Sequence, residues 1–140
     1  MVLDTNVFVA AYLARNPRSP NREVIQRWLK GEFVLLTASE IILEIVDKLL
    51  EKKVDQQKIL RLITNLLFLA ESIELHAKDI EPIVLDDPDD DIIFACALKG
   101  KAKYLVTYDP HLLSLGTIYK GIYITESLVF LMQIRIAQKE

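Results

Sequence analysis

Acidic residues occur at four places where the chain pattern could bring them to one site. Each follows a short apolar run or sits within or just before one. The places are Asp4, Glu44, the acidic run 86–91 around Pro88, and Asp109. Two carboxylates about 5 Å apart repel by roughly 3 kcal/mol at an effective dielectric of 20. A converging set therefore needs protonation or a counter-ion, and a divalent cation is the economical choice.

The available ligand types favour a hard cation. Carboxylate oxygens suit Mg²⁺ or Mn²⁺, and one cysteine with two histidines offers no cluster typical of zinc. Such an ion can activate water and stabilise charge on a phosphodiester. The candidate metal ligands are Asp4, Asp90, Asp91 and Asp109.

Asp4 and Glu44 also have ordinary structural explanations. Asp4 precedes Thr5 and Asn6, and all three residue types cap helices well. Glu44 lies next to or inside an apolar stripe. It is either at the wet edge of that stripe or buried for a functional reason.

The acidic run has two explanations as well. Helix N-termini favour negative charge, so these acids could be a solvated cap. If Ile93 and Ala97 face a sheet, Asp90 shares their face, whereas Asp91 lies over Phe94. We expect Asp90 to point inward and keep Asp91 as the second choice.

Short apolar runs that alternate with helical patterns predict the elements that position these acids. The expected strands are 1–3, 33–36, 72–75, 104–107 and 122–124. The expected helices are 7–13, 23–30, 40–52, 56–69, 92–98 and 126–138, with Gly31, Ser39, Asp55 and Thr125 at helix ends. This alternation predicts an α/β fold with a parallel sheet between helices. Asp4 and Asp109 would meet at its carboxyl edge, where ligands bind.

Composition narrows the function classes. A chain of 140 residues, 51% hydrophobic, is typical of one domain spanning 1–140. A net charge of −3 argues against coating nucleic acid by phosphate neutralisation. The lone Cys96 allows no internal disulfide, which suggests a cytoplasmic location. We expect no signal peptide before Asp4 and no membrane span.

Taken together, the motifs resemble a PIN domain. They are Val2-Leu3-Asp4-Thr5-Asn6, Glu44 in a helix, Asp87-Pro88-Asp89-Asp90 before 92–98, and Tyr104-Leu105-Val106-Thr107-Tyr108-Asp109. The resemblance spans nearly the whole chain and is greatest to prokaryotic PIN proteins classed as toxins of toxin–antitoxin pairs.

The resemblance implies a Rossmann-like three-layer α/β/α sandwich and an endoribonuclease dependent on Mg²⁺ or Mn²⁺. It also implies a homodimer and an antitoxin that occupies the groove. By motif position, Asp4, Glu44, Asp90 and Asp109 would be catalytic, with Thr5, Asn6 and Thr107 supporting them. The implied reaction is in-line attack of metal-activated water on single-stranded RNA, without a covalent intermediate.

The chain departs from the family at one motif. Relatives often carry Gly-Asp-Lys-Asp-Leu where this chain has Tyr108-Asp109-Pro110-His111-Leu112. His111 thus replaces a second acid, so any role of that position is in doubt. It is either a substrate contact or a loop histidine without a function.

RNA must also be held near the acids. The loop that follows the first expected helix carries three arginines, whereas the lysines near Gly100 are typical surface charges. The candidate RNA-binding residues are Arg15, Arg18 and Arg22. The wide apolar stripe of 40–52 and 56–69 suggests a surface for an oligomer or a partner.

Two alternatives to a toxin ribonuclease remain open. One is a PIN-like interaction module without nuclease activity, although the retention of all four acids argues against it. The other is a nuclease in RNA processing that has no antitoxin.

Overall fold

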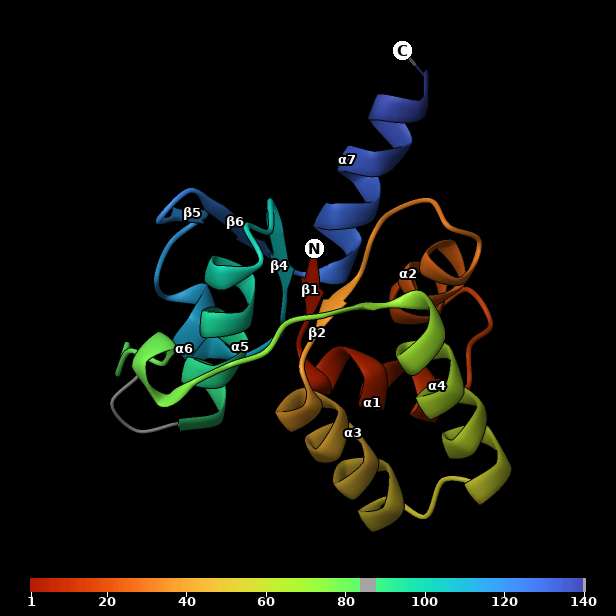
Figure 1. Ribbon diagram of the computed structural model, residues 1–140. Helices are drawn as coiled ribbons and strands as arrows, with labels where there is room; N and C mark the ends of the chain where they lie inside the picture. The colour runs from red at the N-terminus through yellow and green to blue at the C-terminus, as the bar shows by residue number, and fades with distance from the viewer. Residues whose placement is uncertain (84–87, 140) are drawn as a thin grey trace.

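A mostly parallel six-stranded sheet forms the centre of the protein (Figure 1). The structure is a computed structural model, and it describes residues 1–83 and 88–139. The strand order is β3-β2-β1-β4-β6-β5, and only β5 runs antiparallel to its neighbour. The strands are β1 (Val2–Leu3), β2 (Leu36–Thr37), β3 (Glu71–Ser72), β4 (Tyr104–Val106), β5 (Ile118–Tyr119) and β6 (Ile122–Thr125).

Helices cover both faces of this sheet (Figure 1). They are α1 (Thr5–Leu13), α2 (Pro20–Leu29), α3 (Ser39–Glu51), α4 (Gln56–Leu69), α5 (Pro88–Lys99), α6 (Pro110–Leu113) and α7 (Ser127–Lys139), with a 3₁₀ turn, η1 (Ala77–Asp79). Helix α5 packs on one face against β1, β2 and β4, while α1, α2 and α7 pack together on the other. This arrangement confirms the predicted α/β/α fold.

Strand β1 is short but firmly held. Val2 and Leu3 are fully buried and pair with β4 on one side, and Val2 also pairs with β2 on the other. The Asp4 amide donates to the Val106 carbonyl at 2.9 Å, so the ladder continues through the first acid. The position of Asp4 is therefore fixed by the neighbouring strands.

Several expected boundaries were wrong. The strand expected at 33–36 is Leu36–Thr37, and the one expected at 72–75 is Glu71–Ser72. The helix expected at 92–98 begins at Pro88, because proline is well suited to a first turn. The acids from Asp89 onward thus belong to α5, whereas Asp86 and Asp87 lie outside the described residues.

The helix ends follow the predicted chemistry in part. Gly31 adopts a φ of 77° just after α2, and Asp55 caps α4 by accepting from the Gln57 amide at 2.7 Å, both as expected. Ser39, expected as a cap, is the first residue of α3, and Thr125 ends β6. The sequence patterns did not predict α6 and β5, because each is too short to show a period.

Gly100, directly after α5, is needed for close packing. A Cβ there would lie 2.6 Å from Leu36 Cδ1 and 3.2 Å from Ile73 Cδ1. The far end of α5 is therefore seated against side chains of β2 and of the segment after β3.

The hairpin of α3 and α4 leaves large apolar side chains in solvent, among them Leu43, Leu50, Leu60, Leu67 and Phe68. Most of the apolar stripe expected from the sequence is buried, and of these exposed residues only Leu50 and Leu67 belong to it. Among the described residues, none of the helices combines the length and the apolar character that crossing a membrane requires.

Candidate active site

Asp4 is a buried carboxylate held by two hydrogen bonds. It is 5% exposed, and it caps α1 by accepting from the Thr5 amide at Oδ1 over 2.7 Å. Its Oδ2 accepts from the Thr107 hydroxyl at 2.6 Å. The helix-cap explanation is therefore confirmed, and it is compatible with a role as a ligand, because each carboxylate oxygen has a second lone pair.

Thr107 links the ends of β1 and β4. Its fully buried hydroxyl donates to Asp4 and accepts from the Asp109 amide at 2.9 Å. A second link runs between the same segments, since the Tyr108 amide donates to Asn6 Oδ1 at 3.4 Å. Thr5 is also buried. The predicted supporting residues thus lie beside Asp4 and fix the loop that carries Asp109.

Asp109 is more accessible than Asp4. It caps α6 by accepting from the His111 amide at 2.8 Å, and its side chain is 20% exposed. The imidazole of His111 lies alongside, with Nδ1 3.4 Å from Asp109 Oδ1 and 3.9 Å from Asp90 Oδ2. The position that departs from the family motif therefore adjoins two of the acids.

The first turn of α5 supplies the third acid. Asp90 and Asp91 are both buried, but they face different surroundings. Asp90 lines the cavity described below, as expected. Asp91 does not; its Oδ1 accepts from the Ile83 amide at 2.9 Å.

Glu44 projects from α3 toward Asp4 and is half-buried. Burial raises the pKa of its carboxyl, and the nearby charges of Asp89 and Asp4 raise it further. The polar side chain of Thr5 and the positive charge of Lys48 oppose this rise without cancelling it. Glu44 therefore holds a proton more readily than an ordinary glutamate does.

These acids surround one cavity of about 530 Å³ at the carboxyl edge of the sheet. Strand ends, α1, α3, α5 and the turn before α6 all contribute to its wall. The lining residues are Asp4, Thr5, Asn6, Val9, Ala10, Leu13, Glu44, Lys48, Lys52, Asp89, Asp90 and Asp109. The four predicted catalytic acids thus share one cavity.

The donor set fits a divalent cation. Ligand atoms of Asp90, Asp109 and His111 all lie within 4.8 Å of one another. Asp4 borders the same cavity, and carboxylate oxygens are the ligands that Mg²⁺ and Mn²⁺ prefer. The imidazole adds a nitrogen donor that the acidic motif alone would lack.

The three arginines predicted to bind RNA lie elsewhere. Arg15 and Arg18 are exposed in the loop between α1 and α2. Arg22 donates to the carbonyls of Ala11 and Ala14 at the end of α1. None of the three lines the acidic cavity.

Three charged residues of the cavity were not predicted from the sequence as site residues. Asp89 was passed over in favour of its neighbours, and Lys48 and Lys52 were not singled out. The signal for the lysines was present, because Glu44, Lys48 and Lys52 follow one another at intervals of four residues.

Comparison with known proteins identifies the family. No curated protein matches the chain. A family model described as PIN domain matches residues 1–111, which is more than half of the 140 residues. The matched segment contains Asp4, Glu44, Asp90 and Asp109 together with the strands that carry them. The chain therefore belongs to the PIN domain family.

Proposed function

We propose that this protein is an endoribonuclease that uses Mg²⁺ or Mn²⁺ to cleave single-stranded RNA. The observation that carries this proposal is the convergence of four carboxylates on one open cavity at the carboxyl edge of the sheet. PIN domains are generally metal-dependent nucleases. The overall charge of −3 fits an enzyme that meets the phosphate to be cleaved through a cation.

The carboxylates have distinct tasks in this proposal. Asp4, Asp90 and Asp109 would hold the cation. Asp91 would support these ligands indirectly, by fixing the first turn of α5 through the hydrogen bond that its Oδ1 accepts from the Ile83 amide. When bound, the ion would activate water and stabilise the negative charge that develops on the phosphodiester. Glu44, whose pKa is raised by burial, is better suited to accept a proton at its carboxylate than an ordinary glutamate is.

Thr107 and Asn6 act as positioning residues. The Thr107 hydroxyl holds Asp4 Oδ2, and Asn6 Oδ1 holds the backbone at Tyr108. Both fix carboxylates in place before substrate arrives, so little reorganisation is required during the reaction.

We further propose that this nuclease is the toxin of a toxin–antitoxin pair and acts in the cytoplasm as a homodimer. The order of the acidic motifs supports the toxin assignment. Exposed Leu60, Leu67 and Phe68 on α4 support a dimer or partner surface. An antitoxin segment that enters the acidic cavity would block the same carboxylates that the RNA requires.

The test compares Mn²⁺-dependent cleavage of a mixed single-stranded RNA pool by the wild type and by Asp4→Asn. The wild type should cut, and the variant should lose at least a hundredfold in rate, because it lacks a central ligand. Asp47→Asn is the matched control, since this exposed aspartate on α3 does not line the cavity. Equal activity in wild type and Asp4→Asn, or none in either with several metals, would contradict the proposal.

A further inference from the structure

The acidic cavity continues as a groove between α1 and α3, and its charge changes sign along its length. The carboxylates cluster where the strands end, whereas Lys48 and Lys52 line the part toward the C-terminal end of α3. The opposite wall comes from α1, through Val9, Ala10 and Leu13. The groove therefore has a basic wall and an apolar wall beside the acids.

The basic wall is regular. Lys48 follows Glu44 by one helical turn and Lys52 follows Lys48 by another, so each step is about 6 Å along the axis. Both lysines are exposed, and neither forms a salt bridge with a carboxylate among residues 1–83 and 88–139. Their ammonium groups are available to a ligand that carries successive negative charges.

The apolar wall has a different character. The side chains of Val9, Ala10 and Leu13 have no hydrogen-bonding groups, and Leu13 is 46% exposed. A nucleobase can pack against such a surface, but its edge meets no donor or acceptor there. Recognition of one base over another is therefore not expected along this wall.

We propose that single-stranded RNA lies in this groove with its phosphates along Lys48 and Lys52 and its bases against α1. The inference rests on the proposed nuclease function, because it assigns the path of the strand that leads to the carboxylates. Phosphate contacts of this kind position a nucleic acid without reading its sequence. The groove would thus hold the RNA next to the cleavage site and leave base preference to other contacts.

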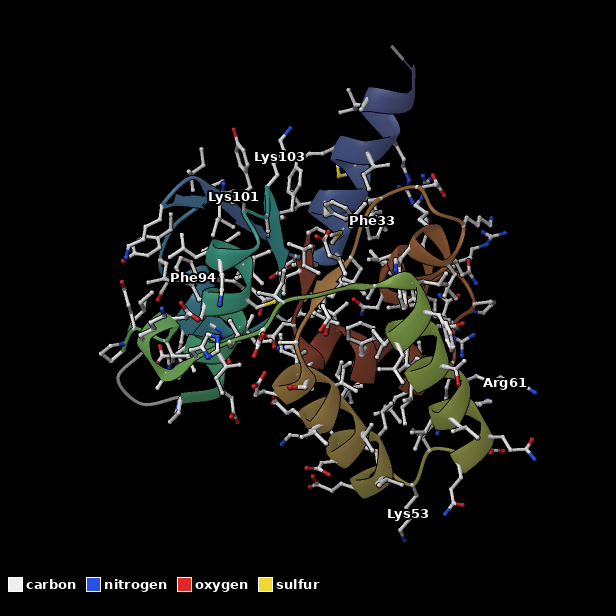
Figure 2. All side chains as sticks on the ribbon, in the orientation of Figure 1. Phe33, Lys53, Arg61, Phe94, Lys101 and Lys103 are labelled. Atoms are coloured by element: carbon white, nitrogen blue, oxygen red, sulfur yellow. The ribbon has the colours of Figure 1, made fainter. Side chains whose placement is uncertain are left out.

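Other basic residues are less well placed for this path. Figure 2 shows Lys101 and Lys103 near the amino edge of the sheet, opposite the end of β1 from which α1 departs. Lys53, the neighbour of Lys52, extends away from the tip of α3 in the same view. These lysines have the charge of the groove lysines but do not line the cavity.

The test measures RNA binding by fluorescence anisotropy over a range of salt concentrations. The probe is a labelled single-stranded RNA, and every protein carries Asp4→Asn so that the strand stays intact. Lys48→Gln/Lys52→Gln should reduce the slope of log affinity against log salt by about 1.4, because each phosphate contact on a single strand contributes about 0.7. Lys101→Gln/Lys103→Gln removes the same charge and should leave the slope unchanged.

Lys48→Arg/Lys52→Arg should keep the wild-type slope, which separates loss of charge from misfolding. Equal slopes for the two glutamine variants, or no binding by the parent protein, would overturn the proposal. A strong preference between oligo-U and oligo-A would overturn the assignment of the bases to α1. If cleavage depends on Asp4 but the two glutamine variants have equal slopes, the RNA path along the groove is refuted and the nuclease function is not. If only Lys48→Gln/Lys52→Gln lowers the slope and the wild type cleaves no RNA, the nuclease function is refuted and the RNA path is not.

Discussion

The acidic site has a buried wall and an exposed wall, and the two are built differently. Asp4 and Asp90 are almost fully covered, and the buried Thr107 hydroxyl holds Asp4. Asp109 and His111 reach further into solvent, with side chains 20% and 57% exposed. The buried wall is fixed by the sheet and by α5, whereas the exposed wall depends on the short helix α6 and its cap.

This difference assigns separate tasks to the walls. A buried carboxylate that is already hydrogen-bonded cannot adjust to a ligand without breaking those bonds. The Asp109 carboxylate also accepts a hydrogen bond, from the His111 amide, but it is 20% exposed and can exchange that partner for water at lower cost. We infer that the buried wall sets where a cation sits, and that the exposed wall tunes which cation is preferred.

The largest effect is expected at Thr107, which holds the buried wall. Thr107→Val removes the hydroxyl that donates to Asp4 and accepts from the Asp109 amide. Metal affinity should fall about tenfold to a hundredfold, and the free energy of unfolding should fall by about 1–3 kcal/mol. Calorimetric Mn²⁺ titration and chemical denaturation measure the two quantities.

Thr107→Ser is the matched control, because it keeps the hydroxyl. It should retain most of the affinity for Mn²⁺. If valine and serine give the same affinity, the hydroxyl does not organise the buried wall.

His111 tests the exposed wall. His111→Asn should weaken binding of Co²⁺ about tenfold, because imidazole nitrogen is a better ligand for Co²⁺ than for Mg²⁺. Mg²⁺ affinity should change little. Visible absorption of Co²⁺ and competition by Mg²⁺ provide the measurements.

His76→Asn provides the matched control, since His76 also stands near a carboxylate, with Nε2 3.9 Å from Glu74 Oε1, and is similarly exposed. It should leave both affinities unchanged. An identical Co²⁺ affinity in wild type and His111→Asn would show that the imidazole does not act as a ligand.

The smallest effect is expected at Glu44, which lies between the two walls. Because its pKa is raised above the ordinary value of 4.5 in the folded protein, the unfolded chain loses this proton first as pH rises. The free energy of unfolding therefore falls through the window between the two pKa values and stays lower above it.

Glu44→Gln removes this pH dependence. The variant should match the wild type below about pH 4 and be slightly more stable at pH 7 without metal. Thermal denaturation at both pH values measures the difference. Greater stability of the wild type at pH 7 in metal-free buffer would contradict the raised pKa.

The sequence predicted the architecture well, because the fold depends on the periodicity of apolar residues within each element and on the alternation of strands with helices. Strands at 1–3, 104–107 and 122–124 and the helices between them have clear apolar patterns, and the central, mostly parallel sheet follows from their alternation. The short elements α6 and β5 have no period to detect. Their positions follow from contacts with β6, which are tertiary.

The positions of the acids in the cavity were easier to predict than the positions of the lysines that line it. Asp4 and Asp109 follow buried strands, so chain order alone places them at one edge of the sheet. The relation between Lys48 and Leu13 depends on how α3 crosses α1, and local sequence does not contain that information. The arginine loop was chosen because it follows Asp4 in sequence, but Arg22 turns back onto the end of α1.

Gly100 has a consequence for how far a remote substitution could act. Helix α5 is about 18 Å long from its acidic first turn to its last residue. Its far end fits against Leu36 only because Gly100 has no side chain. A larger residue there must displace the Leu36 side chain or shift the end of α5, and a shift of α5 would move Asp90 relative to Asp4 without touching either one. A substitution at Gly100 could thus alter the geometry of the carboxylates at the opposite end of α5.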